Sequence, residues 1–476
     1  MADKKTFYIT TTLPYVNAEP HIGFAMEIVQ ADIIARWKKS QGYEVFFNTG
    51  TDEHGQKVFN VAEKEGKDTQ AYTDELAEKF KNLKNLLGLS EDLHFIRTTE
   101  ERHKKAAQEM WQRCLDAGYI DKKQYKIKYC VGCELEKTDH ELEHGKCKIH
   151  PNLELETHEE ENYFFKFSVF GDKLKKLYAK DLKVTPDHRL NEIRALIDRG
   201  LEDFSISRLK KKLSWGVPVP NDPEHVMYVW FDALVSYIST LGWPSDMETF
   251  NKFWRDGTPT QFAGKDQVRQ QAAMWQAMLM AADLPPTREI VIHGFLNFGG
   301  QKMSKSLGNV VSPQDIIHEF GIEALRYFVA REFNQFEDTD ISMEQLKESY
   351  NADLANGIGN LTARIMKLAG TYLDLSQPSP SQGEGKGKGE VYDALEHFEI
   401  QKAINHIWSE IGELDALIQE EKPWVSKDVK VISSIVSKLA HIAYSLAPFM
   451  PETSEKILNA IKNNKLETNL FPRKDA

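Results

Sequence analysis

Three cysteines and one histidine lie at a spacing that suits a metal ion. Cys130, Cys133, Cys147 and His150 give the pattern C-x2-C-x13-C-x2-H. Two close pairs separated by a loop can place three thiolates and one imidazole tetrahedrally around Zn²⁺. Four protein ligands leave no open coordination position, so we expect a structural and not a catalytic ion. The alternative, free cysteines in a core, fits poorly with the polar residues between the two pairs.

Two other stretches suit a phosphate. His21 and Gly23 precede a helical pattern, and a helix N-terminus offers unpaired N–H groups and the positive end of its dipole to an anion. Far along the chain, the loop FGGQKMSKSLGN supplies Lys302 and Lys305. Mobile cations that close on a triphosphate suit nucleotidyl transfer, because charge builds on the α-phosphate and on the departing pyrophosphate. Either stretch alone is equally consistent with an ordinary turn or a solvated loop.

The elements around these stretches predict an α/β fold. A β-branched strand over residues 6–13, a helix marked by apolar residues at spacings of three and four, and a buried strand over residues 43–47 form a βαβ unit. Further strands of the same sheet are expected at residues 226–231, 261–263 and 289–293. Open α/β sheets bind their ligands at the carboxyl ends of the strands, where the His21 turn would lie.

The pattern changes twice along the chain. The cysteine-containing segment interrupts the predicted sheet. After about residue 340 only helical periodicity remains. The exception is a Pro, Ser and Gly-rich stretch at residues 376–390, which is typical of a flexible loop. We therefore expect a Rossmann-type parallel-sheet catalytic domain with a zinc-binding connective insertion, followed by an all-α helix bundle. The predicted boundaries are 1–118 and 223–345 for the two halves of the catalytic domain, 119–222 for the insertion and 346–476 for the bundle.

Composition narrows the class of protein. Of 476 residues, 41% are hydrophobic and 28% are charged, which is typical of a globular protein that divides into several domains. No apolar run reaches membrane-spanning length and no export signal opens the sequence, so we expect a cytoplasmic protein with no membrane contact. A net charge of −12 counts against nucleic acid as a partner unless basic groups cluster locally. One basic cluster lies at residues 207–212, although a single run of this kind is more typical of a solvated surface.

Taken together, these motifs resemble class I aminoacyl-tRNA synthetases and, within them, the methionyl-tRNA synthetase family. The resemblance rests on motifs found in the family's order over nearly the whole chain: PYVNAEPHIG, FFNTGTDEHGQKV, SWGVPVP, YVWFDAL, His293-Gly294 and KMSKSLGN. It implies ATP-dependent activation of methionine to methionyl-adenylate and transfer to the 3′ end of tRNA(Met), including the initiator tRNA, with Mg²⁺ accompanying ATP. A branched-chain specificity is less consistent with this chain, because the insertion is too small for an editing domain. No C-terminal dimerisation domain is recognised, so we expect a monomer.

The resemblance also assigns residues to roles. His21, Lys302 and Lys305 would be catalytic, and ATP would contact His21, Gly23, Phe24, Gly264, Asp266 and Lys305. The residues implied for methionine are Leu13, Tyr15, Asp52 (for the ammonium group), Trp230, Ala233, Tyr237 and His293. Those implied for the anticodon are Asn360, Arg364 and Trp424. Without the resemblance, Trp230, Tyr237 and Trp424 are equally consistent with ordinary core aromatics.

The sequence departs from the family at two places. Phe24 stands where the family has the second histidine of His-Ile-Gly-His, and Gln270 and Gln271 stand where it has Phe-His. A phenyl ring cannot donate to a phosphate, and losing such a donor costs roughly 3 kcal/mol unless another group substitutes. One hypothesis is that a glutamine amide replaces it. Another is a catalytically silent paralogue that binds tRNA or methionine in a regulatory role; the intact lysine loop and zinc quartet favour the enzyme.

Overall fold

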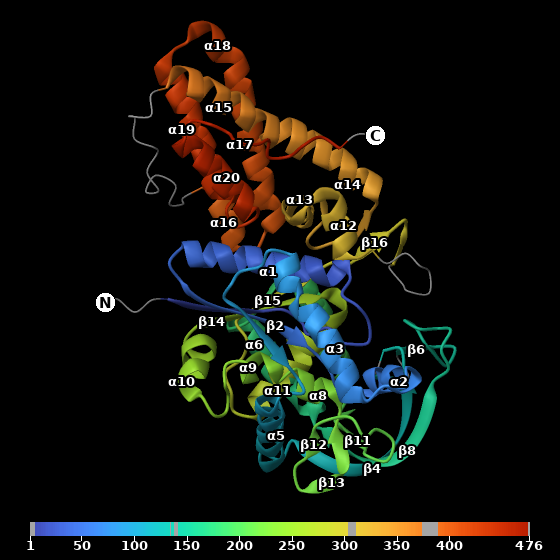
Figure 1. Cartoon of the computed structure of the whole chain (residues 1–476). Coiled ribbons are helices and arrows are strands. Elements are labelled where there is room, and N and C mark those ends of the chain that lie inside the picture. Colours follow the sequence, from blue (N-terminus) through green and yellow to red (C-terminus); the bar gives the residue numbers. More distant parts are fainter. Residues whose placement is uncertain (1–4, 134, 138–140, 303–310, 374–388, 475–476) are drawn as a thin grey trace. The chain divides into compact units, whose positions relative to one another are not determined.

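Two compact units make up the chain. The computed structural model describes residues 5–133, 135–137, 141–302, 311–373 and 389–474. The first unit contains Met1–Glu19, Glu44–Asn82 and Asp92–Ile292, and the second contains Pro20–Tyr43, Leu83–Glu91 and His293–Ala476. Each unit is therefore assembled from segments that are far apart in the sequence (Figure 1).

A six-stranded sheet organises the first unit. Its order is β3 (Leu93–Arg97), β2 (Glu44–Thr51), β1 (Thr6–Thr10), β14 (Thr258–Gly264), β15 (Glu289–His293) and β9 (Lys183–Thr185). The pairs β3–β2, β2–β1, β1–β14 and β15–β9 are parallel. The order of the strands reverses at β1: β2 and β3 follow on one side, and β14, from much later in the chain, lies on the other. This is the switch point at which doubly wound sheets bind ligands, and the predicted Rossmann-type class is confirmed.

The prediction of a strand over residues 226–231 was wrong. The chain is extended only in β13 (Asp222–Met227), which belongs to a separate antiparallel sheet with β11 (Ser207–Leu209) and β12 (Pro218–Val219). Residues from Val229 to Ala233 form helix α8 instead. The run is apolar because Val229, Trp230 and Phe231 are all buried, and a short buried run does not distinguish a strand from a helix.

The cysteine-containing segment has its own sheet. Strands β4 (Ile120–Cys130) and β8 (Glu156–Phe165) pair antiparallel over ten residue pairs, with β10 (Phe204–Ser205) and β5 (Leu135–Glu136) at the edges. A two-stranded ribbon, β6 (Leu142–Glu143) and β7 (Lys146–Cys147), completes it. Strand β9 lies inside the range predicted for the insertion but forms the edge of the main sheet.

The remaining helices of the first unit cover and connect its sheets. They are α2 (Gln56–Lys64), α3 (Thr69–Lys81), α5 (Glu101–Asp116), α6 (Gly171–Lys180), α7 (Asp187–Arg199), α9 (Ser236–Ser239), α10 (Met247–Phe250) and α11 (Trp275–Ala281). Immediately before α11 the chain makes a π-helical turn, η5 (Gln270–Met274). Such turns are rare and occur often at functional sites.

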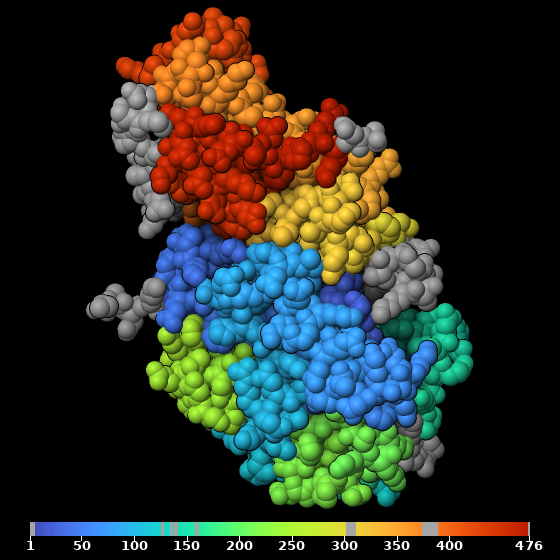
Figure 2. Space-filling model, in the orientation of Figure 1, coloured from blue at the N-terminus to red at the C-terminus, as the bar shows by residue number. Residues whose placement is uncertain are grey.

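The second unit is mainly helical. It contains α1 (Ile22–Ser40), α4 (Leu83–Leu86), α12 (Pro313–Phe320), α13 (Ile322–Tyr327), α14 (Met343–Ser349), α15 (Asn360–Tyr372), α16 (Glu390–Glu396), α17 (Ile400–Glu421), α18 (Pro423–Ser426), α19 (Val429–Leu446) and α20 (Pro451–Lys462). A small sheet joins β16 (Leu296–Phe298) to β17 (Gln301–Lys302) and β18 (Thr339–Ile341). The predicted helix after the His21 turn and the C-terminal helices are confirmed, and α18 forms the tip of the bundle (Figure 2, orange-red).

A buried ion pair ties α1 to the C-terminal helices. Asp32 on α1 and Arg326 on α13 are both fully buried, and their side chains approach to 2.8 Å. The Arg326 guanidinium also donates to the carbonyls of Phe449 at 2.7 Å and Pro448 at 3.1 Å. A buried charge is tolerated only when it is paired and hydrogen-bonded, and Arg326 meets both conditions.

Within the described residues, one helix is long and apolar enough to cross a membrane. This is α19, and half of it is buried inside the protein. A core helix of a bundle passes the same test of length and composition, so α19 is weak evidence for a membrane span.

Candidate functional site

The parallel sheet brings two of the predicted methionine-site residues together at its carboxyl edge. Tyr15 follows β1, and Asp52 follows β2, which is the adjacent strand. The Asp52 N–H donates to the Pro14 carbonyl at 3.0 Å, and the Val16 N–H donates to the Asp52 carbonyl at 3.2 Å. Asp52 is 2% exposed. The ladder thus extends past both strand ends and holds a buried carboxylate beside an aromatic ring.

Aromatic side chains from α8 and α9 surround this edge. Trp230 packs edge-on against Tyr15, with ring centroids 6.0 Å apart, and Tyr237 packs edge-on against Trp275 at 5.9 Å. Leu13 and Tyr15 lie against the same apolar cluster, in which Trp230 and Tyr237 are buried. Ala233 is buried as well. These surroundings are apolar and polarizable, as a thioether requires.

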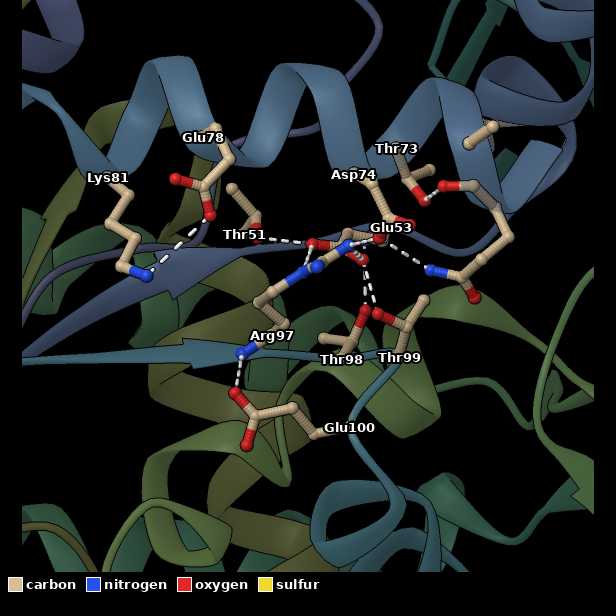
Figure 3. Close-up of polar contacts among 12 residues, drawn as sticks. Thr51, Glu53, Thr73, Asp74, Glu78, Lys81, Arg97, Thr98, Thr99 and Glu100 are labelled. Atoms are coloured by element: carbon tan, nitrogen blue, oxygen red, sulfur yellow. Dashed lines mark hydrogen bonds and ion pairs between the residues drawn. The ribbon is translucent and has the colours of Figure 1, made fainter. Parts of the chain in front are cut away.

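Glu53, directly after Asp52, is the most heavily hydrogen-bonded carboxylate of this edge (Figure 3). Arg97 at the end of β3 contacts both of its oxygens, at 2.7 and 2.9 Å. The hydroxyls of Thr51 and Thr99 donate to the same carboxylate at 2.6 and 2.5 Å. Its side chain is fully buried. Bidentate pairing with an arginine gives both strength and orientation, so the loop that carries Asp52 is held rigidly.

Two further contacts hold this loop to neighbouring elements. The Trp215 indole N–H donates to the Glu53 carbonyl at 2.6 Å. The His54 Nδ1 lies 3.2 Å from the Asp232 carboxylate on α8. Burial raises the pKa of Asp232, and the adjacent His54 opposes that rise. The loop is thereby linked to the helix that carries Trp230 and Ala233.

His293 belongs to the second unit, unlike the other residues predicted for methionine. Its Nε2 lies 2.7 Å from the Glu27 carboxylate, and its Nδ1 lies 2.7 Å from the Gly294 carbonyl. Both ring nitrogens are therefore within hydrogen-bonding distance of an oxygen, one of them in a buried carboxylate.

The N-terminus of α1 presents His21 as its capping residue. The His21 Nδ1 accepts a hydrogen bond from the Gly23 N–H at 3.1 Å, which places the hydrogen of a neutral ring on Nε2. A Cβ on Gly23 would lie 3.0 Å from the His21 ring. No acidic residue occupies the first turn. Phe24, by contrast, is only 8% exposed, so its ring contributes to packing.

The other predicted ATP residues are placed only in part. Gly264 ends β14 and is buried, and Asp266 follows in an exposed 3-10 turn. Lys302 ends β17, while Lys305 lies outside the described residues.

The predicted metal ligands converge. One ligand atom from each of Cys130, Cys133, Cys147 and His150 lies within 4.8 Å of all the others. The Cys133 Sγ is 3.1 Å from the His150 Nδ1 and 3.5 Å from the Cys147 Sγ. A Cβ on Gly132 would lie 2.6 Å from the His150 ring, so the turn between the first two cysteines requires glycine. Three sulfurs and one imidazole at this separation fit a tetrahedral metal ion such as Zn²⁺.

The residues predicted to bind the anticodon lie in the helix bundle. Asn360 and Arg364 begin α15, and Arg364 pairs with Asp415 at 2.6 Å. Trp424 lies on α18 and is 44% exposed beside Val425, which is 67% exposed. Residues in the left-handed conformation, Lys422 and Lys427, flank this short helix at its two ends. An exposed indole at a helical tip is suited to stacking on a base.

The comparisons with known proteins agree with this geometry. A family of class I tRNA synthetases, designated (M), matches residues 7–150 and 132–366. The methionine–tRNA ligase of Thermotoga maritima is 40% identical over 96% of this chain and 75% of its own length. That of Thermosynechococcus vestitus is 39% identical over 95% of this chain and 89% of its own length. The structure of Mycobacterium tuberculosis methionyl-tRNA synthetase in complex with methionyl-adenylate is similar, with a TM-score of 0.88 and 34% sequence identity. The match covers 98% of this chain and 97% of that chain.

Removal of Arg97 is expected to destabilise the first unit strongly. Arg97→Met leaves the buried Glu53 carboxylate without its bidentate partner, which should lower the free energy of unfolding by about 3–5 kcal/mol. Lys79→Met is the matched control, because Lys79 pairs with Glu19 at 2.6 Å between largely exposed side chains and should cost at most about 1 kcal/mol. Urea denaturation measures both, and equal costs would contradict the assignment.

The four metal ligands are expected to act together. Cys133→Ser should lose most of the zinc bound by the purified protein and lower its unfolding temperature, because structural zinc contributes binding energy to folding. Cys114→Ala serves as the control, since Cys114 is buried in the apolar cluster and lies outside the quartet. Elemental analysis gives the metal content. Zinc retained in the serine variant would show that the ion lies elsewhere.

Proposed function

The chain belongs to the methionyl-tRNA synthetase family of class I tRNA synthetases, and from this premise we propose that it activates methionine with ATP and transfers the methionyl group to the 3′ end of tRNA(Met). The proposal rests on one observation: the backbone of buried Asp52 pairs with that of Tyr15 at the carboxyl edge of β1 and β2, where the Tyr15 ring packs against Trp230. A carboxylate for an ammonium group and an apolar surface for a thioether are what free methionine requires.

In the first step, a carboxylate oxygen of methionine attacks the α-phosphorus of ATP in line. The new O–P bond forms as the bond to pyrophosphate breaks, giving methionyl-adenylate. Asp52 holds the methionine ammonium group, and the aromatic residues around Tyr15 exclude water from its side chain. The catalysis is mainly positioning and charge stabilisation.

The phosphates are assigned to the N-terminus of α1. A neutral His21 carries its hydrogen on Nε2, and Gly23 allows close approach of a phosphate to the backbone. Lys302 and Lys305 are proposed to bind the phosphates, Gly264 and Asp266 the adenosine, and Mg²⁺ to accompany ATP and neutralise its charge. His293, linked to Glu27, is proposed as part of the methionine site. Phe24 contributes packing to this site and no hydrogen bond.

In the second step, a hydroxyl of the terminal ribose of the tRNA attacks the methionyl carbonyl carbon and AMP leaves. Asn360 and Arg364 are proposed to bind anticodon base edges and Trp424 to stack on a base. Zn²⁺ held by the Cys130 quartet would fix the fold of the insertion. We further propose a cytoplasmic monomer that accepts the initiator tRNA as well.

Methionine-dependent ATP–pyrophosphate exchange tests the first step. Exchange with methionine, and little with leucine, isoleucine or valine, is the expected result. His21→Ala should lower the exchange rate about 100-fold, because one donor to the developing phosphate charge is lost. Phe24→Leu should change it less than about threefold, since a buried ring donates no hydrogen bond. A large loss in Phe24→Leu would place that ring against ATP instead.

Aminoacylation of tRNA(Met) tests the second step. Trp424→Ala should lower kcat/KM for the tRNA by about 5- to 150-fold, because stacking on one base is worth about 1–3 kcal/mol. Val425→Ala is the control, since Val425 is the more exposed neighbour but offers no ring. The exchange reaction, which needs no tRNA, provides the internal reference. Equal losses in the two variants would contradict a stacking role.

A further inference from the structure

The hairpin that ends at Lys302 turns through two glycines. Strands β16 and β17 pair antiparallel, and only Gly299 and Gly300 connect them. Their φ angles are 64° and 78°, in the left-handed region that favours glycine. Two consecutive left-handed residues are typical of a tight two-residue hairpin. We refer to residues 296–302 as the lysine hairpin.

A carboxylate from another strand holds this turn. The Gly300 N–H donates to the Asp340 side chain, whose two oxygens lie 2.8 and 2.9 Å from the nitrogen. The ladder of a two-residue hairpin offers this N–H no acceptor of its own. A charged acceptor makes a shorter and stronger hydrogen bond than a neutral one, so Asp340 fixes the turn firmly.

Strand pairing places Asp340 close to the end of the hairpin. It is the middle residue of β18, which runs parallel to β16 with Asn297 opposite Asp340. Asn297 also lies opposite Lys302 on β17. The register therefore puts these three residues in one row, with neighbouring strands about 4.8 Å apart. The residue that holds the turn is thus only two strands away from the lysine.

The segment that leads into β18 packs closely on the chain just before the hairpin. We refer to this segment, residues 334–340, as the clamp. A Cβ on Gly294 would lie 2.2 Å from the Glu337 carbonyl oxygen, so the clamp can approach this closely only because the residue is glycine. The Phe295 N–H also donates to the Asp338 side chain at 3.0 Å. The clamp therefore holds the chain before the hairpin as well as the turn within it.

Gln335 secures the other end of the clamp. Its side chain is buried, with its Nε2 donating to the Phe398 carbonyl at 2.7 Å and its Oε1 accepting from the Ile400 N–H at 2.9 Å. Its own carbonyl accepts from the Gly294 N–H at 3.1 Å. A buried amide with both of its groups satisfied rigidifies its surroundings. Asp340 thus projects from a segment that is fixed to the start of α17.

The bond between Gly300 and Asp340 lies where water can reach it. Both residues are exposed, so an N–H released from the carboxylate would be hydrated and the free energy of unfolding would change little. The main consequence of the bond is geometric, because it limits the positions that the lysine hairpin can take.

We propose that Asp340 is a positioning residue that fixes the lysine hairpin for adenylate formation and acts through Lys302. Charge develops on the departing pyrophosphate, and a cation stabilises it only from the correct place. A displacement of about 1 Å can cost on the order of 100-fold in rate. The inference rests on the proposed function, in which Lys302 binds the phosphates, and adds the group that holds the backbone of this lysine.

Pyrophosphate exchange with methionine tests this role. Asp340→Ala should lower kcat about tenfold and change KM for methionine less than about twofold, because the hairpin loses its fixed position while the amino-acid site is untouched. Asp340→Asn keeps an oxygen that accepts from the Gly300 N–H and should recover most of the rate. Asp246→Ala is the matched control, since it removes another exposed carboxylate that accepts a backbone N–H, from Thr249 at 3.0 Å, and should leave kcat unchanged.

A double-variant cycle separates positioning from a purely structural role. Once Lys302→Ala has removed the cation, adding Asp340→Ala should lower kcat by less than about twofold more. A full tenfold further loss in that background would overturn the inference, as would an unchanged rate in Lys302→Ala alone. Should Asp340→Ala fail to fold, Asp340→Glu, which moves the carboxylate by one methylene, enters the same cycle. A parent protein that shows no exchange with methionine would instead refute the proposed function.

Discussion

A carboxylate without access to water must be surrounded by donors, and in this chain that requirement governs the site. Glu53 is satisfied by Arg97 from β3, by Thr51 from β2 and by Thr99 beyond β3. These donors come from two neighbouring strands, so the ends of both strands are fixed relative to the loop. Asp52 and His54 are the sequence neighbours of Glu53, so their backbone is fixed together with it. The buried Asp52 carboxylate thus lies next to a residue that an ion pair and two hydroxyls hold in place.

The sequence predicted the elements with the strongest local signals. The βαβ unit, the cysteine quartet and the C-terminal helices follow from periodicity, from ligand spacing and from loss of strand pattern, and each is present. Residues 226–231 were predicted incorrectly because a buried apolar run carries no period. The participation of β9 in the main sheet was missed because a three-residue strand has too little pattern to detect.

Other features could not be predicted from local signals. Arg97 and Glu53 are 44 positions apart, and the buried side chains of Gln261, Gln271, Gln276 and Thr287 come from different segments that hydrogen-bond to one another. Such groups are brought together by tertiary structure: by the register of parallel strands for Arg97 and Glu53, and by helix packing for the glutamines. Family resemblance indicated that Gln270 and Gln271 were unusual, but the buried contacts of Gln271 with Gln261 and Tyr237 are visible only in the structure.

The buried pair of Asp32 and Arg326 bears on how such a protein can be divided. The guanidinium is satisfied partly by the carbonyls of Pro448 and Phe449 in the C-terminal bundle and partly by the Asp32 carboxylate on α1. A gene fragment encoding only the first 345 residues would therefore express α1 together with an Arg326 cation deprived of two of its carbonyl acceptors. The C-terminal bundle is, in this respect, a scaffold for the helix near the beginning of the chain, and the two cannot be exchanged as independent modules among relatives without carrying this contact along.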